Sequence, residues 1–259
     1  MPAIIPIPAF SDNYIWLVRE GQEAVVVDPG DADPVLRYLE SEALTLTAIL
    51  STHHHGDHVG GNAALLERYA VPVFGPAREA IPGRTRALAE GDTVEVPGIG
   101  CTLAVVDVPG HTAGHIAYVG EIGGEPIAFV GDTLFAGGCG RLFEGTPDQM
   151  TVSLGKLAAL PDATRVYCAH EYTLANLRFA AAVEPRNAAL QARIVRDRAK
   201  RDRDLPTVPS TIADERATNP FLRTTEPAVF AAAQAHAGRS LAGPVAAFAT
   251  LREWKNGFR

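Results

Sequence analysis

The sequence predicts an α/β fold followed by a smaller domain that is entirely helical. Residues 1–172 alternate short β-branched runs with turn residues and a few amphipathic stretches, whereas residues 173–259 are rich in Ala, Leu and Arg at helical spacing. The charge changes at the same place, because residues 1–172 hold 9 Lys and Arg against 22 Asp and Glu, and residues 173–259 hold 14 against 8. We therefore expect two domains, with the boundary after Tyr172.

The first part of the chain begins with three strand-like runs separated by turn residues. Because they follow one another closely, we expect an antiparallel meander. A helix with a proline in its first turn, a buried strand and a second helix come next. The expected elements are strands at residues 3–7, 14–18 and 23–27, a helix from residue 33, a strand at 44–50 and a helix at 60–70.

The rest of the first domain consists mostly of short β-branched runs that end in turn residues. One helix interrupts them, and the second domain is expected to contain one long helix followed by two shorter ones. The expected strands are 94–96, 102–108, 116–119, 127–130 and 166–168, and the expected helices are 147–160, 173–204, 227–237 and 244–255.

The turn at residues 51–58 concentrates four histidines and an aspartate directly after a buried strand. In an extended segment successive side chains point to opposite sides. We therefore expect His53 and His55 to reach one metal ion. Asp57 and His58, at the start of the following helix, are expected to reach a second one.

Three further candidate ligands, His111, Asp132 and His170, each follow the end of a predicted strand. The carboxyl ends of strands are where open α/β sheets usually place their sites. We expect His111 to complete the first metal site and His170 the second, with Asp132 bridging both. Imidazole and carboxylate ligands suit zinc, and they also accept iron or manganese.

Four other residues have expected roles outside the ligand set. His54 should point away from the metal ions and orient its neighbours or bind the backbone, and His115 should lie behind the ligands. Asp28, at a strand end, is expected to form a turn, and its carboxylate could also orient a ligand histidine through its ring N–H. His236, in the helical domain, is expected at the surface.

The composition limits the classes of protein to consider. The net charge is −7, 47% of the residues are hydrophobic, and the chain has neither an apolar span of 18 residues nor a secretion signal. We therefore expect a cytoplasmic protein that does not bind membranes, and the acidic first domain argues against nucleic acid as a partner. Cys101, Cys139 and Cys168 are widely spaced and are expected to be reduced packing residues.

Seven short motifs run through the chain in a fixed order. Four of them are Thr52-His-His-His-Gly-Asp-His58, Pro109-Gly-His-Thr112, Gly131-Asp-Thr-Leu-Phe135 and Cys168-Ala-His-Glu-Tyr172, and the others cover residues 5–16, 138–145 and 219–223. Together they resemble the metallo-β-lactamase superfamily, and more narrowly the glyoxalase II family of hydroxyacylglutathione hydrolases. The resemblance covers essentially the whole chain.

This resemblance implies an αββα sandwich with two metal ions at its edge, followed by a helical domain that helps to hold glutathione. The implied ligands are His53, His55 and His111 for one metal ion, Asp57, His58 and His170 for the other, and Asp132 for both. The implied glutathione contacts are Arg141, Phe143, Tyr172, Arg252 and Lys255. Two of these contacts lie in the basic second domain.

The activity implied by the resemblance is hydrolysis of S-(2-hydroxyacyl)glutathione thioesters, from S-D-lactoylglutathione to D-lactate and glutathione, in methylglyoxal breakdown. A hydroxide bridging two divalent metal ions would be the nucleophile, with Asp57 and Asp132 as catalytic carboxylates. The small-molecule thioester would be the partner of a monomeric chain. Two related activities stay open, those of a mononuclear iron persulfide dioxygenase and of a lactonase. The complete two-metal ligand set argues against the dioxygenase.

Overall fold

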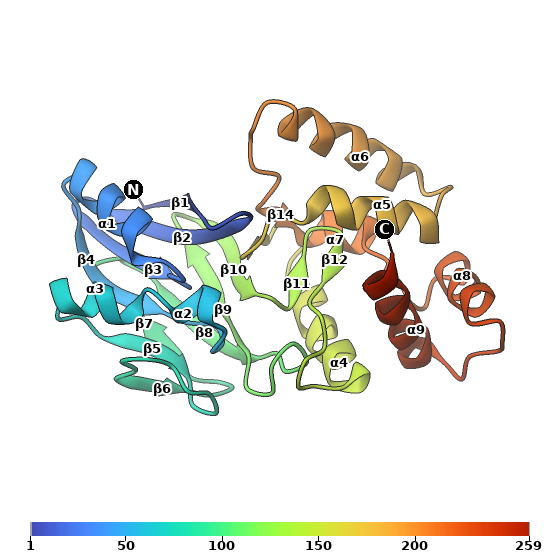
Figure 1. The fold of residues 1–259 in the computed structure, drawn as a ribbon, viewed down its shortest axis with the longest axis horizontal. Helices are drawn as coiled ribbons and strands as arrows, with labels where there is room; N and C mark the ends of the chain where they lie inside the picture. The colour runs from blue at the N-terminus through green and yellow to red at the C-terminus, as the bar shows by residue number, and fades with distance from the viewer. Residues whose placement is uncertain (1, 259) are drawn as a thin grey trace.

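The computed structural model describes residues 2–258. Among these residues, two six-stranded sheets pack against each other, and helices lie on the outer sides of the pair (Figure 1). The remaining helices gather at one end of the molecule, beside a small two-stranded hairpin. The predicted αββα sandwich followed by a helical part is therefore confirmed.

The first sheet follows the order of the chain, β1-β2-β3-β4-β5-β6. Its first three strands are antiparallel, which confirms the predicted meander, and the next pairs run parallel. The strands are β1 (Ala3–Ala9), β2 (Asn13–Glu20), β3 (Glu23–Val27), β4 (Thr45–Leu50), β5 (Val73–Pro76) and β6 (Arg86–Leu88).

The second sheet has the order β14-β13-β10-β9-β8-β7. Most neighbours in it are antiparallel, but β10 and β13 are parallel and end at the same edge. Its strands are β7 (Thr93–Glu95), β8 (Thr102–Asp107), β9 (Ile116–Ile122), β10 (Glu125–Gly131), β13 (Arg165–Cys168) and β14 (Ser210–Thr211). The separate hairpin consists of β11 (Leu134–Phe135) and β12 (Gly138–Cys139).

Alternation along β2 explains the layers. Ile15 and Leu17 pack in one buried cluster with Leu39 of the first helix, while Trp16 and Val18 pack in another cluster that joins the two sheets. A strand that is apolar on both faces belongs inside a layered fold. The helices of this part are α1 (Ala32–Ser41), α2 (Gly56–Val59), α3 (Asn62–Arg68) and α4 (Pro147–Ala158).

The C-terminal helices share the core of the sandwich. Phe179, Phe221 and Phe248 belong to the same buried cluster as Tyr118 and Phe129, and β14 pairs with β13. The boundary after Tyr172 stays a prediction. These helices are α5 (Thr173–Val183), α6 (Ala188–Arg201), α7 (Ile212–Thr218), α8 (Pro227–Ala237) and α9 (Pro244–Gly257).

Several predicted boundaries are wrong. The helix expected over residues 173–204 is two helices, because Pro185 disfavours helical backbone at the preceding residue and Asn187 caps α6. The helix α1 begins before residue 33, because Asp31 is its cap and accepts the N–H of Asp33. The helix expected over 60–70 corresponds to α3. The short helix α2 just before it, the short strands β5, β6, β11, β12 and β14 and the helix α7 are absent from the prediction.

The helices of residues 2–258 are all too short or too polar to cross a membrane.

Candidate metal centre

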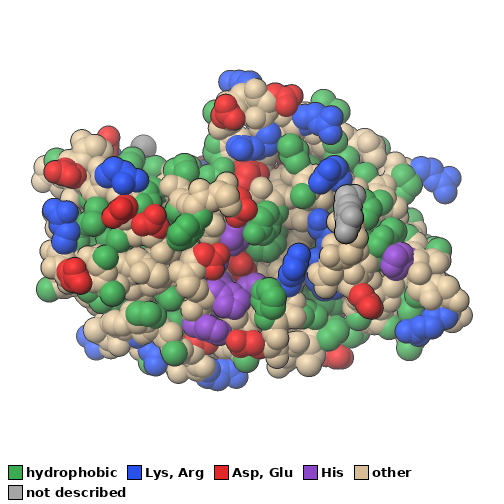
Figure 2. All heavy atoms as spheres, in the orientation of Figure 1, with side chains coloured by type: hydrophobic (Ala, Val, Ile, Leu, Met, Phe, Trp, Pro, Cys, Tyr) green, Lys and Arg blue, Asp and Glu red, His purple; other side chains and the backbone are tan. Residues whose placement is uncertain are grey.

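Strand ends bring the candidate ligands to one edge of the sandwich. In the second sheet β8, β10 and β13 run in the same direction, and the segments after them carry His111, Asp132 and His170. The loop after β4 of the first sheet carries the other candidates. Figure 2 shows histidine and acidic side chains gathered in a hollow, with Lys and Arg side chains nearby on the side of the C-terminal helices.

The alternation expected in the loop after β4 holds for the three histidines, since His53 and His55 face one ligand group and His54 faces Glu79, but it ends where α2 begins. The chain bends at Thr52 and His53 and enters α2 at Gly56. Asp57 and His58 therefore come from the first turn of a helix. The helix start, and not strand alternation, separates these two residues from the histidines before them.

The first ligand group consists of His53, His55 and His111. The Nδ1 atom of His55 lies 3.2 Å from His53 Nε2 and 3.0 Å from His111 Nε2. Asp132 Oδ2 lies 3.4 Å from His111 Nε2. The structure thus brings together the three nitrogen ligands predicted for one metal ion.

The second ligand group consists of Asp57, His58 and His170. Asp57 Oδ2 lies 3.7 Å from His58 Nε2 and 3.5 Å from His170 Nε2. Asp132 Oδ1 lies 3.4 Å from each of these two nitrogens. Since its other oxygen faces His111, Asp132 presents one oxygen to each ligand group, as a bridging ligand must.

Unpaired atoms in this centre fit a bound cation. His58 Nε2 and Asp132 Oδ1 are buried and have no hydrogen-bond partner among residues 2–258. Leaving a buried polar atom unpaired costs about 1–3 kcal/mol, so such atoms usually have a ligand. The two ligand groups together offer five imidazole nitrogens beside carboxylate oxygens, which are ligands that zinc, iron and manganese accept. The donor set therefore fits two divalent ions.

Burial determines the charge of the histidines. It lowers the pKa of all three histidines in the first ligand group, which leaves neutral rings with free lone pairs. Burial also disfavours charge on His58 and His170, but the carboxylate of Asp132 outweighs it and raises the pKa of both. These two histidines in turn hold the pKa of Asp132 well below its usual range, against the effect of burial.

Asp28 and His115 support the ligands from behind. Asp28 accepts the Nδ1–H of His58 over 3.1 Å, and also the N–H and the hydroxyl of Thr52 over 2.7 Å each. Asp28 therefore orients a ligand histidine, and it also bends the chain, with a φ of 53° and a carbonyl oxygen that accepts the N–H of Gly30 over 2.9 Å. The Nε2 atom of His115 accepts the N–H of Asp132 over 3.1 Å, so His115 lies behind the ligands as expected.

Two glycines allow neighbouring segments of the chain to pack closely around Asp132. Gly131 has a φ of 48°, and a side chain there would collide with Thr52 Oγ1 and the ring of His115. At Gly140 a Cβ atom would collide with the carbonyl oxygen of Asp132. Glycine tolerates both conditions because it has no Cβ atom.

His54 turns away from both ligand groups, but it binds carboxylates instead of the backbone. Its Nδ1 lies 2.9 Å from Glu79 Oε2, and its Nε2 lies 3.4 Å from Glu144 Oε1. Buried Glu79 also accepts the hydroxyl of Thr112 and, over 2.9 Å, the N–H of Gly114. Glu79 therefore joins the loop of His54 to the loop that carries His111. Sequence reasoning did not include this contact.

The remaining predictions concern His236 and the three cysteines. His236 is exposed and stacks on Trp254 with 4.3 Å between ring centroids. Cys101, Cys139 and Cys168 are free, and the last two are buried, as expected for packing residues.

One cavity of about 510 Å³ joins the ligands to the predicted substrate contacts. Its wall includes His55, Asp57, His111, Asp132 and His170 together with Arg141, Phe143, Tyr172, Arg252 and Lys255. Phe143 is 63% exposed, and Tyr172 stacks on His170 with 4.7 Å between ring centroids. Metal chemistry and substrate contacts can therefore act on the same bound molecule.

The two basic residues of α9 share a helix face as expected, but they differ in burial and in their hydrogen bonds. Arg252 is only 6% exposed and donates to the carbonyl oxygen of Cys139 over 2.6 Å. Lys255 Nζ donates to the carbonyl oxygen of Ala175 over 3.2 Å. Burial and the nearby arginines lower the pKa of Lys255 to about 8. Arg252 therefore fixes the hairpin as well as lining the cavity.

Two polar residues of the cavity wall are missing from the sequence predictions. Asn176 lies four residues after Tyr172, and Asn256 lies four residues after Arg252. Residues four apart lie on the same face of a helix. This spacing, applied to the predicted contacts, would have identified both.

Comparisons with known proteins cover the whole chain. Residues 9–170 match the model of the metallo-beta-lactamase superfamily, and residues 171–258 match that of the hydroxyacylglutathione hydrolase C-terminus. The chain is 59% identical to the hydroxyacylglutathione hydrolase of Cupriavidus taiwanensis, over 100% of both chains.

Solved structures show the same fold. ETHE1 from Myxococcus xanthus superposes with a TM-score of 0.67 and 27% identity, over 98% of this chain and 90% of that one. TTHA1623, solved in a di-iron-bound form, has a TM-score of 0.54 and 34% identity, over 64% of this chain and 91% of that one. With these matches, the chain belongs to the hydroxyacylglutathione hydrolase family of the metallo-β-lactamase superfamily.

Proposed function

We propose that this protein hydrolyses S-(2-hydroxyacyl)glutathione thioesters and converts S-D-lactoylglutathione to D-lactate and glutathione. The observation that carries the proposal is one cavity whose wall includes members of both ligand groups, the shared Asp132 and the five predicted substrate contacts. The name of the relative from Cupriavidus taiwanensis, identical at 59% of positions, supports the same substrate class.

Two divalent metal ions are the proposed cofactors, with zinc first and iron or manganese as alternatives. The first ligand group would hold one ion, the second group the other, and Asp132 both. When bound, the ions supply a hydroxide nucleophile at neutral pH and polarise the thioester carbonyl. The di-iron form in which TTHA1623 was solved keeps iron among the candidates.

Side chains of the cavity wall are proposed to assist the attack of water on the thioester. Asp57 and Asp132 line the cavity with carboxylate oxygens that can accept a hydrogen bond from the attacking water. The leaving group is a thiolate whose conjugate acid has a pKa of about 8.5, so it can leave without a dedicated acid. Cys139 is a thiol on the same wall, but burial raises its pKa, which makes it a poor nucleophile.

The basic residues of the wall are proposed to bind glutathione. The tripeptide carries two carboxylates, and Arg141 and Lys255 have head groups that do not form ion pairs with any of residues 2–258. Phe143 and Tyr172 would provide apolar contact for the rest of the tripeptide. All these residues belong to one chain, so the proposed working unit is a monomer. Light scattering of the eluted protein tests that proposal.

Elemental analysis combined with three substrates tests the function. The purified protein is assayed with S-D-lactoylglutathione, with a lactone and with glutathione persulfide. We expect two divalent ions per chain and a strong preference for the thioester. One iron per chain, with persulfide oxidation and no thioester turnover, would refute the proposal.

Asp132→Ala tests the bridging role. Because each ligand group faces one oxygen of Asp132, the variant should lose metal from both positions and nearly all of its activity. A variant with full metal content would contradict the assignment of Asp132 as the shared ligand.

A further inference from the structure

Residues 10–14, which comprise the turn between β1 and β2 and the first two residues of β2 and are called the β1–β2 turn below, contact the second ligand group through consecutive residues. The side chains of Asp12 and Asn13 reach two of the ligands, and Tyr14 reaches the residue that follows one of them. This turn lies in the motif over residues 5–16, to which the proposed function gives no task.

Asp12 fixes the imidazole of His170. The Nδ1–H of His170 donates to Asp12 Oδ1 over 2.8 Å. With the proton held on Nδ1, Nε2 keeps its lone pair for a metal ion, and this nitrogen lies 3.4 Å from Asp132 Oδ1. A carboxylate bound in this way sets the tautomer and ring orientation of a ligand histidine and raises its basicity.

Asn13 fixes the carboxylate of Asp57. Its Nδ2 donates to Asp57 Oδ2 over 3.1 Å, and this is the oxygen that faces His58 and His170. Asn13 is buried. Asp57, in contrast, lies on a helix of only four residues, and its side chain is 42% exposed. Few other contacts restrain this carboxylate, so its orientation depends on Asn13.

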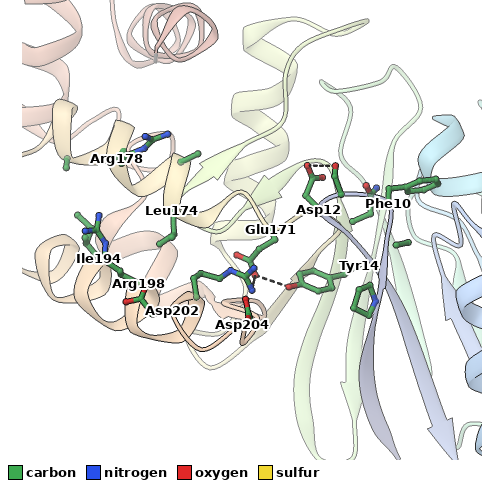
Figure 3. A pocket seen from close by; sticks show the side chains of 17 residues that line it. Phe10, Asp12, Tyr14, Glu171, Leu174, Arg178, Ile194, Arg198, Asp202 and Asp204 are labelled. Atoms are coloured by element: carbon green, nitrogen blue, oxygen red, sulfur yellow. Dashed lines mark hydrogen bonds and ion pairs between the residues drawn. The ribbon is translucent and has the colours of Figure 1, made fainter.

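The turn has a fixed position because the backbone joins it to the loop after β13. The N–H of Tyr14 donates to the carbonyl oxygen of Ala169 over 2.7 Å, and the N–H of Glu171 donates to that of Asp12 over 2.8 Å. Tyr14 Oη also donates to Glu171 Oε2 over 3.1 Å. Figure 3 shows Asp12, Tyr14 and Glu171 at a cavity of about 1010 Å³, whose lining includes Asn13.

The first ligand group is supported differently. The Nδ1–H of His111 donates to the backbone carbonyl of Arg141 over 2.9 Å, and His53 Nδ1 lies 3.0 Å from Thr52 Oγ1. Within the described part of the chain, no hydrogen bond joins residues 10–14 to this group. The turn therefore acts on one ligand group alone.

We propose that Asp12 and Asn13 are positioning residues that set the affinity of the second metal position and leave the first unchanged. The inference rests on the proposed two-metal function and extends it to residues outside both ligand groups. Loss of such a partner weakens metal binding about 10- to 100-fold in comparable sites. Asp12→Ala and Asn13→Ala should therefore release one ion well before the other.

Graded zinc buffers test this inference. Zinc-loaded wild type, Asp12→Ala and Asn13→Ala are equilibrated at decreasing free zinc, and the zinc per chain is measured by elemental analysis. In each variant one zinc ion should leave at about 10- to 100-fold higher free zinc than in the wild type, and the other at unchanged free zinc. Asp12→Asn keeps an acceptor oxygen and should recover most of the affinity.

Ser11→Ala is the matched control in the same turn. Its hydroxyl contacts Asp12 Oδ2 over 3.3 Å and not the oxygen that holds His170, so it should follow the wild type. Equal weakening of both positions, or unchanged release in Asp12→Ala at wild-type thermal stability, overturns the inference. If Asp12→Ala does not fold, Asp12→Asn and Asn13→Ala decide by the same criterion.

These outcomes are separate from those of the substrate assay. A wild type that holds two zinc ions but does not hydrolyse S-D-lactoylglutathione refutes the proposed substrate, while the zinc release of the variants still tests the positioning role. A wild type that holds only one zinc ion refutes both.

Discussion

Lys255 should make substrate binding depend on pH above neutrality. Burial, together with the charges of Arg252, Arg178 and Arg141 and against the opposing effect of Cys139, lowers the pKa of its ammonium group to about 8. A protonated Lys255 attracts a carboxylate of glutathione, and a neutral one does not. We therefore expect the KM of the thioester to rise as the pH passes through about 8.

The size of this effect follows from the pKa. A group with a pKa of about 8 is about 90% protonated at pH 7 and about 10% protonated at pH 9. If only the charged form binds the carboxylate, KM rises up to roughly tenfold between these values, which corresponds to about 1.4 kcal/mol of binding. The kcat should change little through this group, because Lys255 belongs to neither ligand group.

Lys255→Arg is the matched control, because arginine keeps its charge at every pH of the assay. Initial rates of thioester hydrolysis at pH 7, 8 and 9 give KM and kcat for both proteins. The wild type should show the rise in KM and Lys255→Arg should not, while effects on the metal centre appear in both. A flat wild-type KM, or an equal rise in both proteins, would refute the argument.

Two further predictions concern stability. Glu79→Ala leaves the N–H of Gly114 and the hydroxyl of Thr112 without their acceptor, so it should lower the free energy of unfolding by about 1–3 kcal/mol in urea, and Glu79→Gln should lower it less. Glu215→Ala removes the partner that buried Arg193 holds at 2.7 Å and should cost about 3–5 kcal/mol by the same measurement. Full stability of Glu215→Ala would show that Asp197 alone can pair this arginine.

The sequence predicts those elements of the fold whose own residues show a recognisable pattern. Strands such as β2 and β10 are β-branched runs between turn residues, and the ligand residues follow directly after strand ends, so pattern alone locates both. His111 and His170 were found in this way. The edge to which they belong could be expected because strands of like direction end together.

The missing elements lack such signals. Strands β5 and β6 are short, β5 ends in Pro76, and two of the three residues of β6 are exposed, so neither shows apolar alternation. Pro185 is a local signal for the break between α5 and α6, but the prediction of one helix over residues 173–204 followed the Ala-, Leu- and Arg-rich composition instead. The contacts of Asp12 with His170 and of Asn13 with Asp57 span 158 and 44 residues, and no local pattern carries such a pairing.

The two ligand groups differ in how firmly the chain holds them. The first is fixed from within, since His53 is fully buried and the Nδ1–H of His111 binds a backbone carbonyl. In the second, only His58 is held by a buried carboxylate, while half-exposed Asp57 and the ring of His170 depend on side chains of the β1–β2 turn. Because of this unequal support, we expect the second position to give up its metal ion first. It also ties the completeness of the centre to the pairing of the first hairpin with the loop after β13.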